Sequence, residues 1–367
     1  MGTASSDPNL FSFDFLHFSL GNFAPFIHSR AVVTLGSSST MLHPFLRHLR
    51  AIWTILRRLL SPSPLAEPRI IHNEPQTAIS ELDERIPPGS WDSHMHVVDP
   101  SIYPLTADAR YCPKTYTLEQ ALLFEKSVGL DKIVLVQPSI YGNDNSCMLD
   151  ALRTLGPERG RAIVQFEPQT IPGSTLTEWH QMGVRGVRLN FSSVGESLDA
   201  EPLRSLLHRY AEDCGPLGWV IQLYLPMSMI PFLEPIVPEL GVRVCIDHMG
   251  HPSLPEIPPS SPYDIPGFQS LINLLNSGTT FVKLSALYRL SDSKDYHDLE
   301  PIAKELLRVA GTTGVIFATD WPHTRFEGLD IKPLVHTVLQ WCDGDEVLTE
   351  RVFRGNAEDI WDAKPCN

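Results

Sequence analysis

Eight short apolar or β-branched segments recur after residue 90, and most are separated by stretches long enough to form a helix. The segments begin near Trp91, Lys132, Arg161, Val184, Trp219, Val242, Phe281 and Val315. Helical patterns of apolar residues occupy intervening stretches such as 118–128, 203–214 and 299–309. Because strand and helix alternate over a length close to the ~250 residues of a (β/α)8 barrel, the sequence predicts an α/β fold of this TIM-barrel type.

An open, doubly wound sheet is the alternative arrangement for alternating strands and helices. A dinucleotide-binding sheet of that kind carries a glycine-rich phosphate loop after its first strand, and no such loop follows the segment at Trp91. The barrel is therefore favoured. In a barrel the carboxyl ends of the strands line the active site, so residues far apart in sequence are expected to meet there.

Composition limits the partners of this chain. Of its 367 residues, 43% are hydrophobic and 20% are charged, which is enough to bury a large core. Basic and acidic residues balance up to Ser90, so the net charge of −14 belongs entirely to the rest of the chain and argues against nucleic acid as a partner. The six cysteines are scattered without a CxxC pair, which favours a reducing compartment, and Cys245 is expected to be a small buried hydrophobe.

An N-terminal extension, residues 1–87, precedes the predicted barrel at 88–361, and a short tail follows at 362–367. From about 42 to 60 its apolar residues follow helical spacing and arginines fill much of the remaining surface, which predicts a basic amphipathic helix. Arginine is too frequent for a membrane-spanning helix. Either the helix contacts a membrane surface or directs the protein to mitochondria, or it packs on the barrel of a cytoplasmic protein as an ordinary surface helix.

Histidine and aspartate residues stand at three predicted strand ends. Alternation along the first strand aims His94 and His96 the same way, so that two imidazoles share one pocket. His248 follows the sixth strand and Asp320 follows the eighth. These side chains bind metals or transfer protons, so the sequence predicts a hydrolytic site at the barrel mouth.

Further polar residues near the strand ends are candidates for substrate binding. Arg188 shares one face of its strand with Gly186 and Asn190, and an inward-facing guanidinium requires an anion. It therefore suggests a substrate with a carboxylate, although an ion pair with Glu167 or Asp247 is the structural alternative. The other candidates are Tyr141, Asn145, Tyr224, Ser285, Arg289 and His323. Asp247 is expected to orient a neighbour, and Trp321 to pack beside the aspartate.

Five motifs together resemble the amidohydrolase superfamily, in the amidohydrolase-related branch that includes 2-pyrone-4,6-dicarboxylate lactonase and sugar-lactone hydrolases. The resemblance covers residues 88 to about 361. The motifs are Trp91-Asp92-Ser93-His94-Met95-His96, Gln137-Pro138-Ser139 through Asn145, Gly183-Val184-Arg185-Gly186-Val187-Arg188, Ile246-Asp247-His248-Met249-Gly250 and Thr319-Asp320-Trp321-Pro322-His323.

This resemblance implies roles for the residues that match. Asp320 would activate water for attack on a lactone carbonyl, while His94, His96 and His248 would polarise that carbonyl or hold a divalent metal. The carboxylate or hydroxyl groups of the substrate would contact Ser139, Tyr224, Arg188 and Arg289.

Two departures from the family pattern narrow these expectations. His251 stands near the place where the dicarboxylate lactonase is expected to carry an arginine. The resemblance therefore does not imply a pyrone dicarboxylate as the substrate. Arg188 and either Tyr224 or Gln222 occupy the places where a binuclear site would use a lysine and a histidine, so two metals are not expected.

The candidate ligand residues are compatible either with one bound metal ion or with a site that has no metal. Neutral imidazoles from His94, His96 and His248 and the carboxylate of Asp320 suit one Zn²⁺ or Mn²⁺, which lowers the pKa of bound water toward ~7. Without a metal, Asp320 acts as general base and a protonated histidine stabilises the oxyanion.

The leading prediction is a hydrolase that opens a lactone or related cyclic ester of a small, anionic metabolite. A metal-dependent decarboxylase of an aromatic or unsaturated acid, from the same superfamily, is the alternative enzyme. A third hypothesis is a barrel that binds a ligand at a membrane without catalysis, and the complete set of His94, His96, His248 and Asp320 argues against it. The oligomeric state is not predicted.

Overall fold

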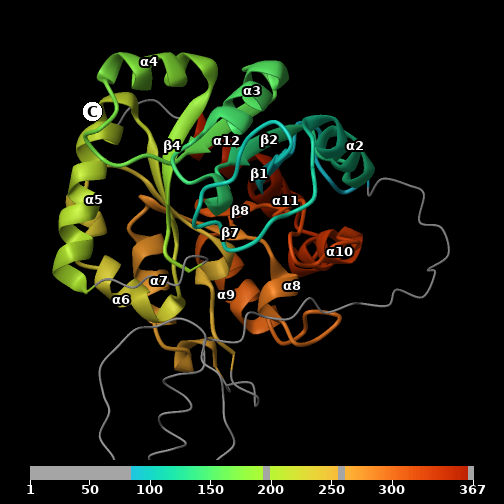
Figure 1. The fold of residues 1–367 in the computed structure, drawn as a ribbon. Coiled ribbons are helices and arrows are strands. Elements are labelled where there is room, and N and C mark those ends of the chain that lie inside the picture. The colour runs from blue at the N-terminus through green and yellow to red at the C-terminus, as the bar shows by residue number, and fades with distance from the viewer. Residues whose placement is uncertain (1–83, 193–198, 255–260, 363–367) are drawn as a thin grey trace, which may run out of the picture. The chain divides into compact units, whose positions relative to one another are not determined.

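A computed structural model describes residues 84–192, 199–254 and 261–362. Eight strands form one parallel sheet in which each strand pairs with the next along the chain, so the predicted (β/α)8 barrel is confirmed (Figure 1). The strands are β1 Trp91–Met95, β2 Lys132–Val136, β3 Gly160–Val164, β4 Val184–Asn190, β5 Val220–Tyr224, β6 Val244–Ile246, β7 Thr280–Leu284 and β8 Val315–Phe317.

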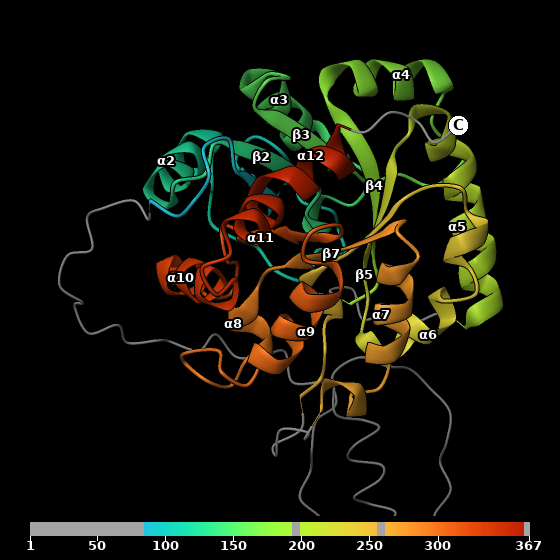
Figure 2. The ribbon, with the colours of Figure 1, turned by 180° about the vertical axis from the view of Figure 1, so that it is seen from behind.

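Helices ring the strands when the molecule is viewed from either side (Figures 1 and 2). The longer ones are α2 Leu118–Val128, α3 Ser146–Leu155, α4 Gly173–Met182, α5 Ala200–Cys214, α7 Phe268–Asn276, α9 Glu300–Ala310 and α10 Lys332–Trp341. The shorter ones are α6 Ile230–Leu233, α8 Leu287–Leu290, α11 Glu346–Glu350 and α12 Asn356–Trp361. The three helices predicted from periodicity are confirmed as α2, α5 and α9.

The ends of α2 show why its prediction was accurate. Thr117 and Gln120 form a reciprocal capping box at the first turn, which satisfies backbone N–H groups that have no partner inside the helix. At the other end Gly129 adopts φ 76°, a left-handed conformation that glycine reaches without steric penalty and that stops the helix.

A buried apolar cluster joins residues of the strands to the last helix, α12. It comprises Trp91, Val134, Val136, Ile163, Val220, Cys245, Phe281, Ile316, Ala357, Ile360 and Trp361. Cys245 is fully buried within it, as predicted. No disulfide joins the cysteines of the described residues.

The barrel closes between β1 and the segment that follows β8. The backbone N–H of Asp320 donates to the carbonyl of His94 (2.9 Å), and that of His96 donates to the carbonyl of Trp321 (2.8 Å). The register of β1 against β2 shifts between Asp92 and Met95. The seam of the barrel therefore brings His94, His96 and Asp320 together through backbone hydrogen bonds.

Two buried carboxyl groups lie between β1 and α2. Asp92 accepts hydrogen bonds from the backbone N–H groups of His94 (3.0 Å) and Thr319 (2.9 Å) and from the hydroxyl of Thr319, and so supports the seam. Burial raises the pKa of Asp92 to about 6. Burial, and then the neighbouring Asp92, hold the pKa of Glu125 well above its usual range. Glu125 therefore keeps its proton in the folded protein to a higher pH than an exposed glutamate does.

The unfolding free energy of the Glu125→Gln variant should depend less on pH than that of the parent protein. Above the pKa of about 4.3 that glutamate has when unfolded, the folded state alone retains the proton, so stability falls by about 1.4 kcal/mol per pH unit. Glutamine has no such proton. Chemical denaturation at about pH 5, 6 and 7 should show a flatter loss of unfolding free energy in the variant, and equal slopes would show that Glu125 ionises normally.

The predicted amphipathic helix at 42–60, and almost all of the extension and tail, lie outside the described residues. The expected location of the protein and the predicted domain limits therefore stay predictions. Among the residues that the structure describes, none of the helices has the length and apolarity that a bilayer span requires.

Candidate active site

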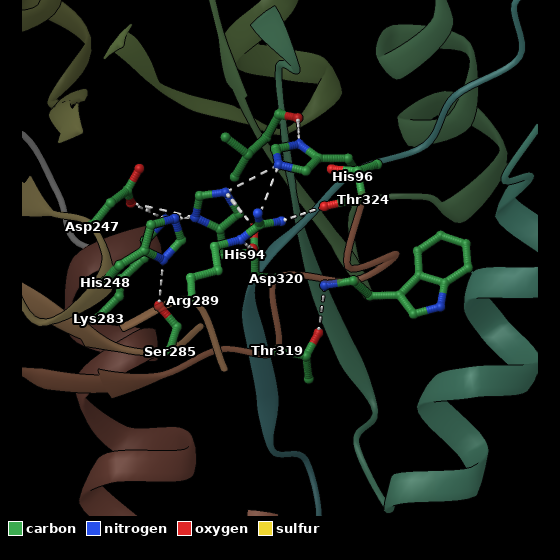
Figure 3. Close-up of polar contacts among 12 residues, drawn as sticks. His94, His96, Asp247, His248, Lys283, Ser285, Arg289, Thr319, Asp320 and Thr324 are labelled. Carbon is green, nitrogen blue, oxygen red and sulfur yellow. Dashed lines mark hydrogen bonds and ion pairs between the residues drawn. The ribbon is translucent and has the colours of Figure 1, made fainter. Parts of the chain in front are cut away.

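The four residues predicted as catalytic lie at the carboxyl ends of the strands and face one another (Figure 3). Nε2 of His94 is 3.3 Å from Nε2 of His96, and each of these nitrogens is 3.7 Å from Oδ1 of Asp320. The ring centroids of His94 and His248 are 4.9 Å apart. All four side chains are buried, with His96 the most exposed at 9%.

Unusual backbone conformations aim two of these side chains into the site. Asp320 has φ 61° and His248 has φ 52°, in the left-handed region that non-glycine residues seldom occupy. Such residues each cost about 1–3 kcal/mol and persist where the surrounding structure holds them. At Asp320 that surrounding structure is the hydrogen-bonded seam between β1 and β8.

The histidines are electrically neutral at physiological pH. Burial, and then the Lys283 ammonium, hold the pKa of His94 well below its usual range. Burial lowers the pKa of His96 to about 4, with a further contribution from Arg188, and burial likewise lowers that of His248 to about 4. Neutral imidazoles can accept protons, donate hydrogen bonds or bind a metal.

Asp320 presents one of its two carboxylate oxygens to the histidines. Oδ2 accepts hydrogen bonds from Nε of Arg289 (2.7 Å) and from the hydroxyl of Tyr288 (2.7 Å), whereas Oδ1 faces His94 and His96. Burial alone would raise the pKa of Asp320, but the Arg289 guanidinium holds it well below its usual range. Asp320 is therefore an ionised carboxylate whose Oδ1 is available to accept a proton.

Tyr288 was not singled out from the sequence, and its contact with Asp320 predicts a role in positioning. The Tyr288→Phe variant should lower kcat about tenfold with little change in KM, because one hydrogen bond to a charged group is lost while Arg289 remains. Steady-state kinetics test this. Tyr103→Phe is the matched control, since Tyr103 donates to Asp150 (2.7 Å) on the exposed surface. Equal kcat in the parent and Tyr288→Phe enzymes would contradict the prediction.

A buried lysine, also missed from the sequence, lies beneath the histidines. Nζ of Lys283 is 2.7 Å from Oε1 of Gln222, 3.2 Å from Nδ1 of His94 and 3.2 Å from Oδ1 of Asp247. Alternation along β7 carries the signal that could have found it, because Lys283 shares a strand face with Ser285, which was a candidate. Asp247 is fully buried, with Oδ1 3.3 Å from Nδ1 of His94 and 3.2 Å from Nζ of Lys283, and the orienting role expected for it stays a prediction.

Arg188 projects into the same network. It donates to the carbonyl of Gln137 (2.9 Å) and lies 3.6 Å from Oδ2 of Asp247, which was one of the ion pairs considered from the sequence. Its side chain is 4% exposed, and its Nε has no hydrogen-bond partner among the described residues. Arg188 thus forms a long ion pair with Asp247, while its Nε–H group is left as a hydrogen-bond donor for a ligand.

The structure brings four further candidates to this site. Oγ of Ser285 is 2.8 Å from Nδ1 of His248, so it orients that ring. Tyr224 packs edge-on against His248 and His251, and Arg289 is the partner of Asp320. His323 is buried against Tyr288 and Phe124, burial lowers its pKa to about 4, and its Nε2 has no hydrogen-bond partner among the described residues.

Three candidates in the turn after β2 do not contact the four predicted catalytic residues through any side-chain hydrogen bond in the described structure. The hydroxyl of Tyr141, a core residue, accepts from the backbone N–H of Asp99 (2.9 Å). Asn145 uses its side chain to bind backbone groups of Asn143 and Gln165. Ser139 begins a short 3-10 helix and makes no side-chain hydrogen bond to a described residue. Their proposed contacts with substrate stay predictions.

The donor set accommodates one divalent metal ion. Ligand atoms of a tetrahedral zinc site with bonds of 2.0–2.1 Å lie about 3.3–3.4 Å apart, close to the separations among His94, His96 and Asp320. His248 does not join this group and instead clusters with His94 and Asp247. In the second cluster the Lys283 ammonium contacts both His94 and the carboxylate of Asp247, whereas in the first cluster Arg289 binds Oδ2 of Asp320 and leaves Oδ1 toward the histidines, so the first suits a cation better.

Comparisons with known proteins agree on one family. The amidohydrolase family model matches residues 91–363. A 4-sulfomuconolactone hydrolase from Hydrogenophaga intermedia is 35% identical over 280 residues, which are 74% of this chain and 88% of that protein. A 2-pyrone-4,6-dicarboxylate hydrolase from Comamonas testosteroni is 29% identical over 251 residues, 65% of this chain and 78% of that protein.

The solved structures include a close match to the barrel. A protein from Acinetobacter baumannii, assigned as a 2-pyrone-4,6-dicarboxylic acid hydrolase and solved with citric acid bound, superposes with a TM-score of 0.63 at 25% identity. The match covers 75% of this chain and 99% of that chain.

Proposed function

This chain belongs to the amidohydrolase family and is a hydrolase, and we propose that it opens a lactone or related cyclic ester of a small anionic metabolite. The observation that carries the proposal is the meeting of an ionised aspartate oxygen and two neutral imidazole nitrogens within 3.7 Å at the mouth of the barrel. The similarity to a 4-sulfomuconolactone hydrolase and a 2-pyrone-4,6-dicarboxylate hydrolase supports a cyclic ester as the substrate.

The proposed reaction uses Asp320 as general base. Its Oδ1 takes a proton from water as the water oxygen bonds to the lactone carbonyl carbon, and imidazole N–H groups stabilise the charge that develops on the carbonyl oxygen. The ring C–O bond then breaks, and the proton held by Asp320 passes to the departing ring oxygen. The product is a hydroxy acid, and the carboxylate of Asp320 is restored.

The charges of the site favour an anionic substrate. Three buried or partly buried cations, Arg188, Lys283 and Arg289, lie against two carboxylates, Asp247 and Asp320. One positive charge is therefore left over among these residues, and the unpartnered Nε of Arg188 provides a donor for a carboxylate or sulfonate.

A divalent ion such as Zn²⁺ or Mn²⁺ would be held by His94, His96 and Asp320, with Nε2 of His94 as a ligand in place of a hydrogen-bond donor. Such an ion polarises a carbonyl and lowers the pKa of bound water when it is present. The roles of Arg289 and Tyr288 are the same with or without the ion, because both bind Oδ2 of Asp320 and keep Oδ1 toward the histidines.

A panel of lactones tests the proposal. Purified protein should release protons from five- and six-membered lactones that carry a carboxylate or sulfonate, measured at constant pH, and should act more slowly on uncharged lactones. Release of CO₂ from an aromatic or unsaturated acid, without opening of any lactone, would favour the alternative decarboxylase and contradict the proposal.

A further inference from the structure

Lys283 is an ammonium group that folding has removed from water. Its side chain is 0% exposed on β7, and the ring of Trp361 lies 5.6 Å from Nζ on the apolar side. Nζ forms hydrogen bonds with Oε1 of Gln222 and Nδ1 of His94, and Oδ1 of Asp247 lies 3.2 Å away as the partner of an ion pair. Burying such a charge is costly unless it is paired and hydrogen-bonded in this way.

The contact between Lys283 and His94 fixes which nitrogen of the imidazole carries the proton. An ammonium group donates hydrogen bonds and cannot accept them. Nδ1 of His94 lies 3.2 Å from Nζ in hydrogen-bonding geometry, so this nitrogen must provide a lone pair. The proton of the neutral ring is then on Nε2, the nitrogen that faces His96 and Asp320.

A second, independent contact leads to the same assignment. Nδ1 of His96 lies 2.7 Å from the carbonyl oxygen of Val136, which only accepts, so His96 carries its proton on Nδ1 and has a bare Nε2. Nε2 of His94 is 3.3 Å from that bare nitrogen. Two lone pairs would repel each other at this separation, whereas a proton on His94 forms a hydrogen bond.

Asp247 is the group that favours the opposite tautomer. Its Oδ1 lies 3.3 Å from Nδ1 of His94, but no hydrogen bond reaches Oδ1 in the described structure. Other groups stabilise the charge of Asp247. Nζ of Lys283 lies 3.2 Å from Oδ1, and the amide of Gln222 donates a hydrogen bond to Oδ2 at 3.1 Å. The hydrogen-bonding geometry therefore assigns Nδ1 to Lys283.

We propose that Lys283 is a positioning residue that holds the proton of His94 on Nε2. The inference rests on the proposed lactone hydrolysis for its consequence, since the Nε2–H of His94 becomes the donor that stabilises the carbonyl oxygen of the substrate. A divalent ion would need the lone pair of this same nitrogen. Lys283 thus opposes metal binding in two ways, by fixing the tautomer and by placing a like charge nearby.

Two measurements on the full-length protein test this inference. The first is the ¹⁵N spectrum of histidine-labelled, chelator-treated protein, in which His94 is assigned by comparison with His94→Asn. The second is the affinity for zinc ions alone, measured by competition with a chromogenic chelator in the parent, in Lys283→Met and in Lys304→Met. Lys304 is the control because it is half exposed on α9, where it pairs with Glu300.

We expect Nε2 of His94 to be protonated and Nδ1 to be unprotonated. We also expect Lys283→Met to bind zinc about tenfold or more tightly than the parent, with no change in Lys304→Met. A proton on Nδ1 would overturn the inference, and so would equal or weaker zinc binding by Lys283→Met. If that variant does not fold, the spectrum of the parent decides alone. Failure to hydrolyse any lactone would refute the proposed function and leave both of these measurements unaffected.

Discussion

Replacing Asp320 with asparagine should lower the rate of lactone hydrolysis by about 10²–10⁴-fold, because the amide cannot take the proton of the attacking water. The fold should survive. Asparagine has the same shape and tolerates the φ of 61° at this position better than most residues. The measurement is kcat for an anionic lactone, with the thermal midpoint of each protein recorded beside it.

Asp343→Asn is a closely matched control for this experiment. Asp343 also has a positive φ, 54°, but it is exposed and lies outside the site. The control variant should keep full activity. Turnover by Asp320→Asn within a factor of about three of the parent rate would eliminate Asp320 as the base, since general-base help exceeds that factor.

Replacing Arg188 with methionine should raise KM for anionic lactones about 10- to 100-fold and change KM for uncharged lactones little. The reason is that a charge-assisted hydrogen bond to the substrate contributes about 1.5–3 kcal/mol, and only a charged substrate makes it. Initial rates on a charged and an uncharged lactone of the same ring size measure the difference.

Arg185→Met controls for the loss of an arginine from the same strand. Arg185 lies on β4, three residues before Arg188, and donates to the backbone carbonyls of His180 and Val184. Its replacement should not distinguish charged from uncharged lactones. Equal losses on both substrates in Arg188→Met would show that Arg188 supports the fold of the site through Asp247 and Gln137 rather than binding the anion.

Most of the barrel was predictable because strand and helix periods are local properties of the chain. The eight strands begin within two residues of the predicted positions, and α2 has the predicted bounds because its caps are encoded by Thr117, Gln120 and Gly129. The register shift in β1 was not predicted. It depends on pairing with β2, about forty positions away, next to the closure against the segment after β8, more than two hundred positions away.

The candidate site was predictable only in part. His94, His96, His248 and Asp320 stand in recognisable motifs at strand ends, and the structure brings them together. Lys283 and Tyr288 have no motif, and their importance comes from contacts with residues on other strands. The sequence predicted one metal cluster of His94, His96, His248 and Asp320. The structure instead groups His94 with His96 and Asp320, and groups His94 and His248 with Asp247. These groupings depend on three-dimensional spacing, which the motifs do not encode.

The most direct test of the central claim is the mass of the product formed from an anionic lactone in water labelled with ¹⁸O. We expect a hydroxy acid heavier than the substrate by one water, with the label in the new carboxylate, and with formation slowed by about 10²–10⁴-fold in Asp320→Asn. A product lighter by CO₂, or an unlabelled product formed equally well by Asp320→Asn, would contradict it.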